Sequence, residues 1–351
     1  FGFEYEQRID REFFLAPEQL WRLMFNNVGR YGNGIGLDLA NPILLIDGQQ
    51  IPLAEYNGES GLLFSENDSI IYNLTTTGQS YFDKQFRDKF GYSTLQFADV
   101  YSHSPDEYSL DMLSPDELSN DGNNSSYTYA GYDYTGNSFA TQPDFQDYWT
   151  AFDAEKGIYT RPLGAFRPIY MAGFVQDKFA FKDLIFNIGV RVDRFDANQK
   201  VPKDIYSPLY GVKTASEVTE FGAHPTTVGD DYVVYVDSEE DPTAITGYRS
   251  GNQWYNKDGL AVEDPRVLQT GTQTIPYLIE GQLENGHKTP NYNTSLAFTD
   301  YNPQISVSPR VAFSFELSEN AIFFAHYDVL AQRPQDRFMP TAKDYYFFEQ
   351  T

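Results

Sequence analysis

In two stretches of this chain, apolar residues alternate with small, polar or charged ones. These stretches are Leu184–Asp196, where the residues at even positions are mostly apolar, and Ile305–Leu317, where those at odd positions are. The residues between them are mostly small, polar or charged. Successive side chains of a β-strand point to opposite faces of the sheet, so this pattern predicts strands with one apolar and one polar face. The apolar residues are Leu184, Phe186, Ile188, Val190, Val192, Ile305, Val307, Pro309, Val311, Phe313, Phe315 and Leu317.

Three further segments are predicted to be strands. They are residues 1–8, 169–181 and 321–331. Only Lys182-Asp183 separates 169–181 from the strand that follows it, which is the length of a tight hairpin turn. Ser318–Asn320 forms a similarly short connection before 321–331. The five strands therefore contain two predicted hairpins.

The other two connections are very long. Residues 9–168 and 197–304 separate predicted strands by 160 and 108 residues, far more than compact domains usually place between two elements. If successive strands run in opposite directions, both long segments leave from one end of the sheet and both tight turns lie at the other. Short turns at one end and long loops at the other are typical of outer-membrane β-barrels. We therefore predict an all-β fold, a transmembrane antiparallel β-barrel with long extracellular loops.

The charge of the chain is concentrated in these two predicted loops. The sequence has 50 Asp and Glu against 25 Lys and Arg, for a net charge of −25, of which −14 lies in 9–168 and −8 in 197–304. Binding to nucleic acid phosphates needs a basic surface, so we expect no nucleic acid partner. Acidic loops favour cationic, metal-bearing or neutral cargo, or a basic protein partner.

The composition excludes several other classes. The chain has no Cys, which excludes disulfides, thiolate metal sites and cysteine nucleophiles. No stretch of 18 uncharged apolar residues predicts a transmembrane helix, and a mean hydropathy of −0.50 remains compatible with strands that are apolar on one face only. With so many acids, chance pairs of carboxylates are expected, so we predict no catalytic site, no enzymatic activity and no tightly bound cofactor.

Several segments resemble TonB-dependent outer-membrane receptors. The similarity is carried by Phe166–Lys178 and Phe186–Asp196 in the first hairpin, and by Ser308–Phe313 and Ala325–Pro334 around the second. Three more segments resemble the large members of the family, which carry an N-terminal carboxypeptidase-like regulatory domain. These are Phe1–Arg8, Phe82–Arg87 and Gly131–Gly136.

The resemblance implies a barrel of about 22 strands that is filled by a plug domain. Only about five strands are predicted here, and the chain begins at Phe1 without an initiator Met or a signal peptide. We therefore expect residues 1–351 to be part of one barrel domain, with the plug domain and the remaining strands outside this chain. The resemblance also implies the outer membrane of a Gram-negative bacterium, with its lipids and lipopolysaccharide, the plug and TonB as partners, and a surface lipoprotein as a further candidate partner.

The polar face of the predicted strands supplies candidates for residues that line the lumen of the barrel. Each of these side chains has two interpretations: a wall that contacts cargo or plug, or an ion-pair network that only fills the interior. The candidates are Asn187, Arg191, Asp193, Arg310, Glu316, His326 and Asp328. Aromatic residues of the loops have two interpretations as well, either contacts to cargo in an outer vestibule or small cores of the loops. They are Tyr148, Trp149, Trp254 and Tyr255.

The leading hypothesis is energised uptake of a specific nutrient, with this chain as barrel wall and substrate vestibule. One alternative is a structural scaffold within a larger outer-membrane assembly, and another is a soluble secreted β-protein that binds or hydrolyses glycans. The acidic run Asp237–Asp241 has the hard oxygen atoms that calcium prefers, but it lacks the Gly and the final Glu of an EF-hand loop. We expect at most a loosely bound divalent cation there.

Overall fold

The computed structural model describes residues 1–28, 36–46, 49–56, 69–75, 79–92, 98–119, 127–269, 273–282, 286–333 and 340–348. The chain divides into two compact units. The first comprises Phe1–Arg11, Phe139–Ala151 and Pro162–Phe348, and the second consists mainly of Glu12–Ser138 and Phe152–Arg161. Strands predominate and the helices are short, in agreement with the predicted all-β class. Within the described ranges, no helix has both the length and the apolar character that crossing a membrane requires.

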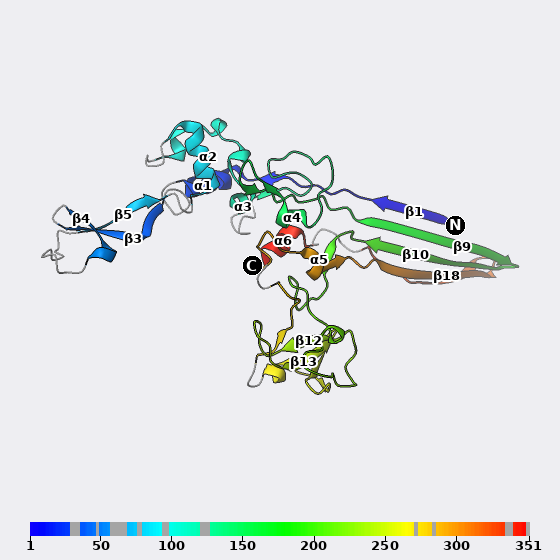
Figure 1. Ribbon diagram of the computed structural model, residues 1–351. Helices are drawn as coiled ribbons and strands as arrows, with labels where there is room; N and C mark the ends of the chain where they lie inside the picture. The colour runs from blue at the N-terminus through cyan, green and yellow to red at the C-terminus, as the bar shows by residue number, and fades with distance from the viewer. Residues whose placement is uncertain are drawn as a thin grey trace. The chain divides into compact units, whose positions relative to one another are not determined.

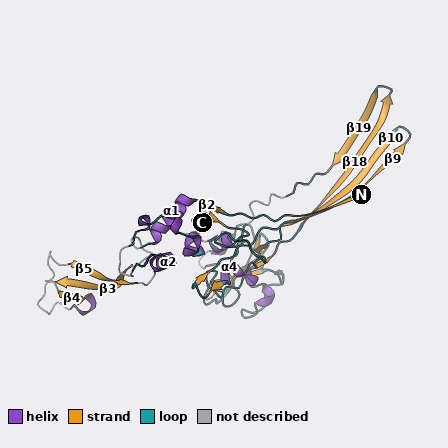
Figure 2. Ribbon diagram, turned by 90° about the horizontal axis from the view of Figure 1, so that it is seen from above, coloured by secondary structure: helices purple, strands orange, loops and turns teal. Residues whose placement is uncertain are grey.

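The first unit contains a five-stranded sheet in which every neighbouring pair is antiparallel (Figures 1 and 2). The strand order is β1-β9-β10-β18-β19. Sequence neighbours β9 and β10 form one hairpin, β18 and β19 the other, and β10 pairs with β18 between them. The bounds are β1 Gly2–Gln7, β9 Ile169–Phe181, β10 Leu184–Asp196, β18 Gln304–Ser318 and β19 Ala321–Asp328.

The strands lie where the alternation predicts them. β9 and β10 begin and end at the predicted residues, β1 and β18 differ by one residue at each end, and β19 ends three residues early, at Asp328. At the first turn, Lys182 has φ +52°, the left-handed conformation that two-residue hairpin turns require. The pairing between β18 and β19 is irregular between Glu316 and Ser318, next to the second turn.

The register places the two tight turns at one end of the sheet. At the opposite end, Gln7 lies opposite Ile169, and Asp196 lies opposite the same residue from the other side. The chain enters both long insertions from that end, as the strand directions predict. Among the described strands, β1 and β19 pair on one side only, so the sheet is open at both edges.

The insertion between β10 and β18 carries a second five-stranded sheet, with the order β15-β14-β13-β12-β16. Its core is formed by Val218, Val234, Val236 and Tyr248, all of which are fully buried. The strands are β12 Val233–Val236, β13 Ile245–Ser250, β14 Gln253–Asn256, β15 Ala261–Val262 and β16 Ile275–Pro276. The first unit also contains β11 Lys200–Pro202, paired with β17 Phe298–Asp300, and the short helices α4 Asp147–Thr150, α5 Thr294–Ala297 and α6 Ala342–Tyr346.

The second unit has a helical part with an aromatic core. The longer helices are α1 Pro17–Asn27 and α2 Tyr81–Phe90. α2 begins at Ser80, whose side chain accepts a hydrogen bond from the backbone of Asp83, and ends at Gly91 in the left-handed conformation. Phe82 and Phe86 of α2 are completely buried. Besides short 3-10 helices, the unit contains α3 Pro115–Ser119, β2 Phe14–Leu15, β3 Gly36–Ile46, β4 Gln49–Pro52, β5 Ser69–Thr75, β6 Tyr127–Thr128, β7 Phe152–Asp153 and β8 Ile158–Tyr159.

Candidate functional site

The strand register gathers the predicted apolar residues on one face of the five-stranded sheet. Ile188 of β10 lies opposite Val311 of β18, and Val190 lies opposite Val175 of β9. Opposite residues of an antiparallel pair point to the same face, so one continuous surface runs over all five strands. This apolar face comprises Phe3, Tyr5, Met171, Val175, Phe179, Phe181, Leu184, Phe186, Ile188, Val190, Val192, Ile305, Val307, Pro309, Val311, Phe313, Phe315, Phe323, Ala325 and Tyr327.

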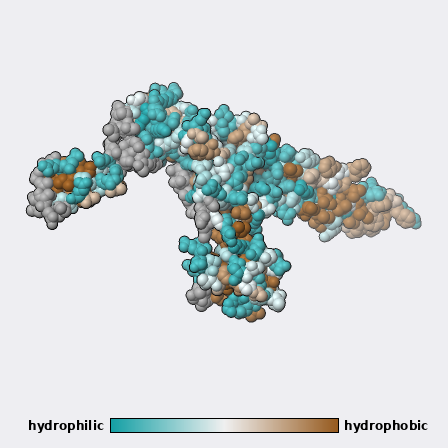
Figure 3. Space-filling view, viewed as in Figure 1, coloured by the Kyte–Doolittle hydropathy of each residue, from teal (hydrophilic) through white to brown (hydrophobic). Residues whose placement is uncertain are grey.

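The apolar face is exposed. Val307 is 57% exposed, Tyr327 65% and Phe181 72%. Figure 3 shows hydrophobic side chains gathered over this sheet. Monomeric soluble proteins rarely expose contiguous apolar patches larger than a few hundred Å². A surface of this kind is stable only when another apolar phase or another apolar surface covers it.

Aromatic rings collect on the apolar face at the end that carries the tight turns. The ring centroids of Phe186 and Phe313 are 5.9 Å apart, and Phe323 lies 5.9 Å from Phe313 and 5.3 Å from Phe315. These rings come from β10, β18 and β19, so they form a band across neighbouring strands. Girdles of aromatic residues at the edge of an apolar band are a feature of membrane β-barrels.

At the other end of the sheet, a charged pair follows the row of apolar side chains on β10. Arg194 Nη2 lies 2.9 Å from Asp196 Oδ2, and both residues have the parity of the apolar face. Between Leu184 and Val192 every residue of that parity is apolar, over a rise of about 27 Å. At a strand tilt of about 40°, this rise spans about 21 Å, close to the roughly 25 Å apolar band of outer-membrane barrels.

One acidic residue interrupts the apolar face. Asp177 of β9 lies opposite Ile188, and its carboxylate accepts a hydrogen bond from the backbone N–H of Lys178 at 2.8 Å. Lys178 itself points to the other face, because it lies opposite Asn187. This exception explains why the alternation in β9 was less regular in the sequence than in β10 and β18.

All seven lumen candidates share the opposite, polar face of the sheet. Asn187, Arg191 and Asp193 have the same parity on β10. The register places Arg310 opposite Asp328, and Ala312 lies between Asn187 on one side and His326 on the other. Glu316 lies near the second turn, opposite Ile322. The seven residues therefore occupy one face, although they do not form one cluster.

Arg191 is the centre of a polar network on that face. Its guanidinium donates to Asp193 Oδ1 at 2.9 Å, to the hydroxyl of Tyr170 at 2.9 Å and to Glu4 Oε2 at 3.0 Å. The Tyr170 hydroxyl in turn donates to Asp193. These contacts join β1, β9 and β10, and they fix the position of the Tyr170 ring. The sequence indicated Arg191 and Asp193, but not Glu4 or Tyr170.

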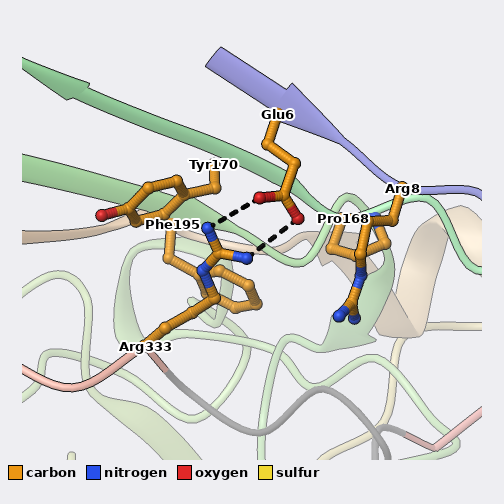
Figure 4. A pocket seen from close by; sticks show the side chains of 6 residues that line it. All are labelled: Glu6, Arg8, Pro168, Tyr170, Phe195 and Arg333. Atoms are coloured by element: carbon orange, nitrogen blue, oxygen red, sulfur yellow. Dashed lines mark hydrogen bonds and ion pairs between the residues drawn. The ribbon is translucent and has the colours of Figure 1, made fainter. Parts of the chain in front are cut away.

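Next to this network, Arg333 binds to Glu6 and Tyr170 (Figure 4). Its guanidinium lies 2.9 Å from Glu6 Oε1 and 3.1 Å from Glu6 Oε2, and its central carbon lies 3.9 Å from the centroid of the Tyr170 ring. A small pocket surrounds this contact, lined by Glu6, Arg8, Pro168, Tyr170, Phe195 and Arg333. The sequence offered no signal for it, because Glu6 and Arg333 are 327 positions apart.

Two of the vestibule candidates belong to a buried aromatic core. Tyr148 and Trp149 of α4 are each only 1% exposed. The Trp149 ring lies 5.5 Å from Tyr292 and 6.2 Å from Phe298, measured between ring centroids. In the described structure they therefore hold segments of the first unit together, which is the second of the two interpretations that the sequence left open.

Trp254 and Tyr255 lie on β14 and are partly buried. The ring centroid of Trp254 lies 4.7 Å from that of Tyr235 and 5.7 Å from the guanidinium carbon of Arg249. Tyr255 contacts Tyr232, with the ring centroids 4.9 Å apart. Both candidates contribute to the packing of the second sheet, and each keeps part of its surface exposed.

Within the acidic run 237–241, Asp237 is hydrogen-bonded to the residues that follow the run. Asp237 Oδ1 accepts backbone hydrogen bonds from Thr243 at 2.8 Å and Ala244 at 3.0 Å, and Asp237 Oδ2 accepts the Thr243 hydroxyl at 2.5 Å. The Thr243 side chain and these N–H groups lower the pKa of Asp237 to about 2. Among the described residues, no group of three His, Cys, Asp or Glu side chains is arranged to hold a metal ion.

No protein-family model, curated protein or solved structure matches this chain.

Proposed function

We propose that this chain forms part of the wall of an outer-membrane β-barrel, in a transporter of the TonB-dependent receptor type that takes up a specific nutrient. The exposed apolar face is the single observation on which this proposal depends most. Lipid acyl chains would cover it, and the polar face with the Arg191 network would line the interior. This arrangement satisfies both faces of the sheet at once.

Three further features support a membrane location. The row of apolar side chains on β10 has about the length of an outer-membrane apolar band. Aromatic rings lie at one end of it and the Arg194–Asp196 pair at the other. Both tight turns lie at the aromatic end, and both long insertions leave from the charged end. The resemblance of the two hairpins to TonB-dependent receptors points to the same class.

The open edges of the sheet suggest how the wall continues. Unpaired N–H and C=O groups cannot be left in the hydrocarbon region, since each would lose its hydrogen bonds to water. Under this proposal, further strands pair with β1 and β19 and close the barrel. A plug domain and TonB would then act on cargo in the interior, as the family resemblance implies.

The negative charge of the loops gives a prediction about cargo. With −22 of the net −25 in the two insertions, a cationic solute is attracted to the outer end of the wall. Stopped-flow association of a fluorescent hexalysine peptide should therefore slow as the ionic strength rises. A rate that is independent of salt would remove electrostatic steering from the proposal.

Site-directed spin labelling tests the membrane location directly. Since the chain contains no Cys, single variants such as Phe186→Cys, Ile188→Cys and Val190→Cys each carry one nitroxide label. In the whole chain reconstituted into lipid vesicles, these labels should be accessible to oxygen, which partitions into lipid, and protected from a water-soluble nickel chelate. Asn187→Cys, on the polar face between them, is the matched control and should lack this lipid signature.

A different accessibility pattern would contradict the proposal. If the chain is monomeric in buffer without detergent, and labels on the apolar face are protected from both reagents, those side chains are packed against protein. The soluble β-protein would then be the better interpretation.

A further inference from the structure

We propose that Glu6 and Tyr170 form a binding site for a guanidinium or a similar organic cation, and that Arg333 of the same chain occupies this site in the present structure. The two carboxylate oxygens of Glu6 face the two terminal nitrogens of Arg333, and the Tyr170 ring lies against the guanidinium. Together they provide a planar acceptor pair and an aromatic face for one flat cation.

The contacts are those that recognise a guanidinium rather than a simple point charge. Two parallel N–H···O bonds, of 2.9 and 3.1 Å, match the fork of a guanidinium to a carboxylate. At 3.9 Å from the ring centroid, the guanidinium carbon is well within the range of a cation–π interaction. Both contacts are made by the head group of Arg333, so a free ligand with the same head group can make them as well.

The receiving side of the site is fixed in place. The Tyr170 hydroxyl accepts from Arg191 and donates to Asp193, which holds the ring in its orientation. Pro168 and Phe195 line the pocket beside it. Arg8 also lines the pocket, but its guanidinium pairs with Asp10 at 3.2 Å. Glu6 and Tyr170 come from paired positions of β1 and β9, so the sheet itself sets their separation.

The segment that delivers Arg333 is held far less firmly. β19 ends at Asp328, and the next residues are exposed, with Leu330 at 79%. The Arg333 and Glu6 side chains are themselves 32% and 38% exposed, and ion pairs with this exposure contribute little to stability. Displacement of Arg333 by a ligand therefore does not require disruption of a packed core.

The local charge favours a cation once Arg333 leaves. Glu4 and Asp193 on the same face are both paired with Arg191, so this guanidinium does not compensate Glu6. A cation that enters between Glu6 and Tyr170 restores the charge balance that Arg333 provides when it occupies the site. The role of this cation as transported cargo rests on the proposed function, whereas the binding site itself does not.

Removal of the internal occupant tests the inference. Isothermal titration of the whole chain in detergent micelles with methylguanidinium should give saturable binding to Arg333→Ala. The unmodified protein should bind several-fold more weakly, because Arg333 competes with the ligand for the same site. The double variant Arg333→Ala/Glu6→Gln should lose the binding.

Arg194→Ala is the matched control. It removes a guanidinium from the same sheet and frees Asp196 on the other face, while Arg333 still occupies the Glu6–Tyr170 site. It should therefore bind methylguanidinium no more tightly than the unmodified protein does. If Arg333→Ala does not fold, recovery of its near-UV circular dichroism on addition of methylguanidinium is the readout. Failure of recovery, absence of binding by folded Arg333→Ala, or binding that survives Glu6→Gln would each overturn the site. None of these outcomes depends on membrane insertion, which the spin-label experiment measures separately.

Discussion

The guanidinium of Arg191 donates to the carboxylate of Glu4 at 3.0 Å, across 187 positions of sequence. This contact connects β10 to β1 over the intervening strand β9, on the polar face of the sheet. It lies directly behind an apolar face that the described chain leaves exposed. The sheet thus separates a hydrogen-bonded ionic surface from a hydrophobic one within the thickness of a single layer, and this separation underlies the proposed role as a barrel wall.

The two faces should differ sharply in their tolerance of charge. Val190→Arg places a cation near the middle of the apolar face and should cost about 2–4 kcal/mol of folding free energy in a bilayer. Gln176→Arg introduces the same side chain at nearly the same level, but on the polar face, and should cost much less. Urea titrations of both variants in lipid vesicles measure the difference. Equal costs would contradict the assignment of the faces.

The buried ion pair between Arg249 and Asp204 should be costly to break from one side only. Both residues are less than 10% exposed, and Arg249 also donates to the Tyr235 hydroxyl at 3.0 Å. Arg249→Met leaves the Asp204 charge buried and should destabilise the second sheet by about 3–5 kcal/mol. The double variant Arg249→Met/Asp204→Leu should recover much of this loss. Chemical denaturation followed by circular dichroism provides the measurement, and a double variant that is no better than the single one would argue against a desolvation penalty.

The aromatic core around Trp149 should be structural. Trp149→Ala removes a side chain that is 1% exposed and packs against Tyr292 and Phe298, so we expect a loss of about 3–5 kcal/mol. Ile205→Ala, at a position that is 73% exposed, should change stability by no more than about 0.5 kcal/mol. Hydrogen exchange of the backbone near these residues measures both effects. A fully stable Trp149→Ala variant would restore the vestibule interpretation for this residue.

The turn at Asp237 should depend on pH in the acid range. Hydrogen bonds from the Thr243 side chain and backbone lower the pKa of Asp237 from its ordinary value of 3.8 to about 2 in the folded state. Its stabilising contribution is therefore fully present above about pH 4 and is lost as the pH falls through about 2. The amide resonances of Thr243 and Ala244 should titrate with a midpoint near 2 in NMR spectra. Asp237→Asn should abolish that transition, and a midpoint close to 4 would show that the turn does not stabilise the carboxylate.

Much of the five-stranded sheet was predictable because its signal is local. The alternation in β10 and β18 specifies which residues share a face, and the short connection at Lys182-Asp183 specifies the hairpin. The parity also placed all seven lumen candidates on one face. Asp177 weakened the pattern in β9, although it did not change the position of the strand.

The long insertions were much less predictable. Their folded elements, such as the sheet built around Val234 and Tyr248, depend on contacts between segments without a regular period. Trp149 illustrates the same limit, because an aromatic residue in a loop is equally compatible with exposure and with a small core. Only the contacts with Tyr292 and Phe298 distinguish between the two.

The amino-acid order alone determined where the strands of the main sheet begin and end and which side chains are apolar together, since a β-strand repeats every two residues. The tertiary structure alone decided which distant residues meet, above all Arg333 with Glu6 and Tyr170. Such pairings depend on the register between strands and on the path of the chain after β19, and no local pattern carries that information.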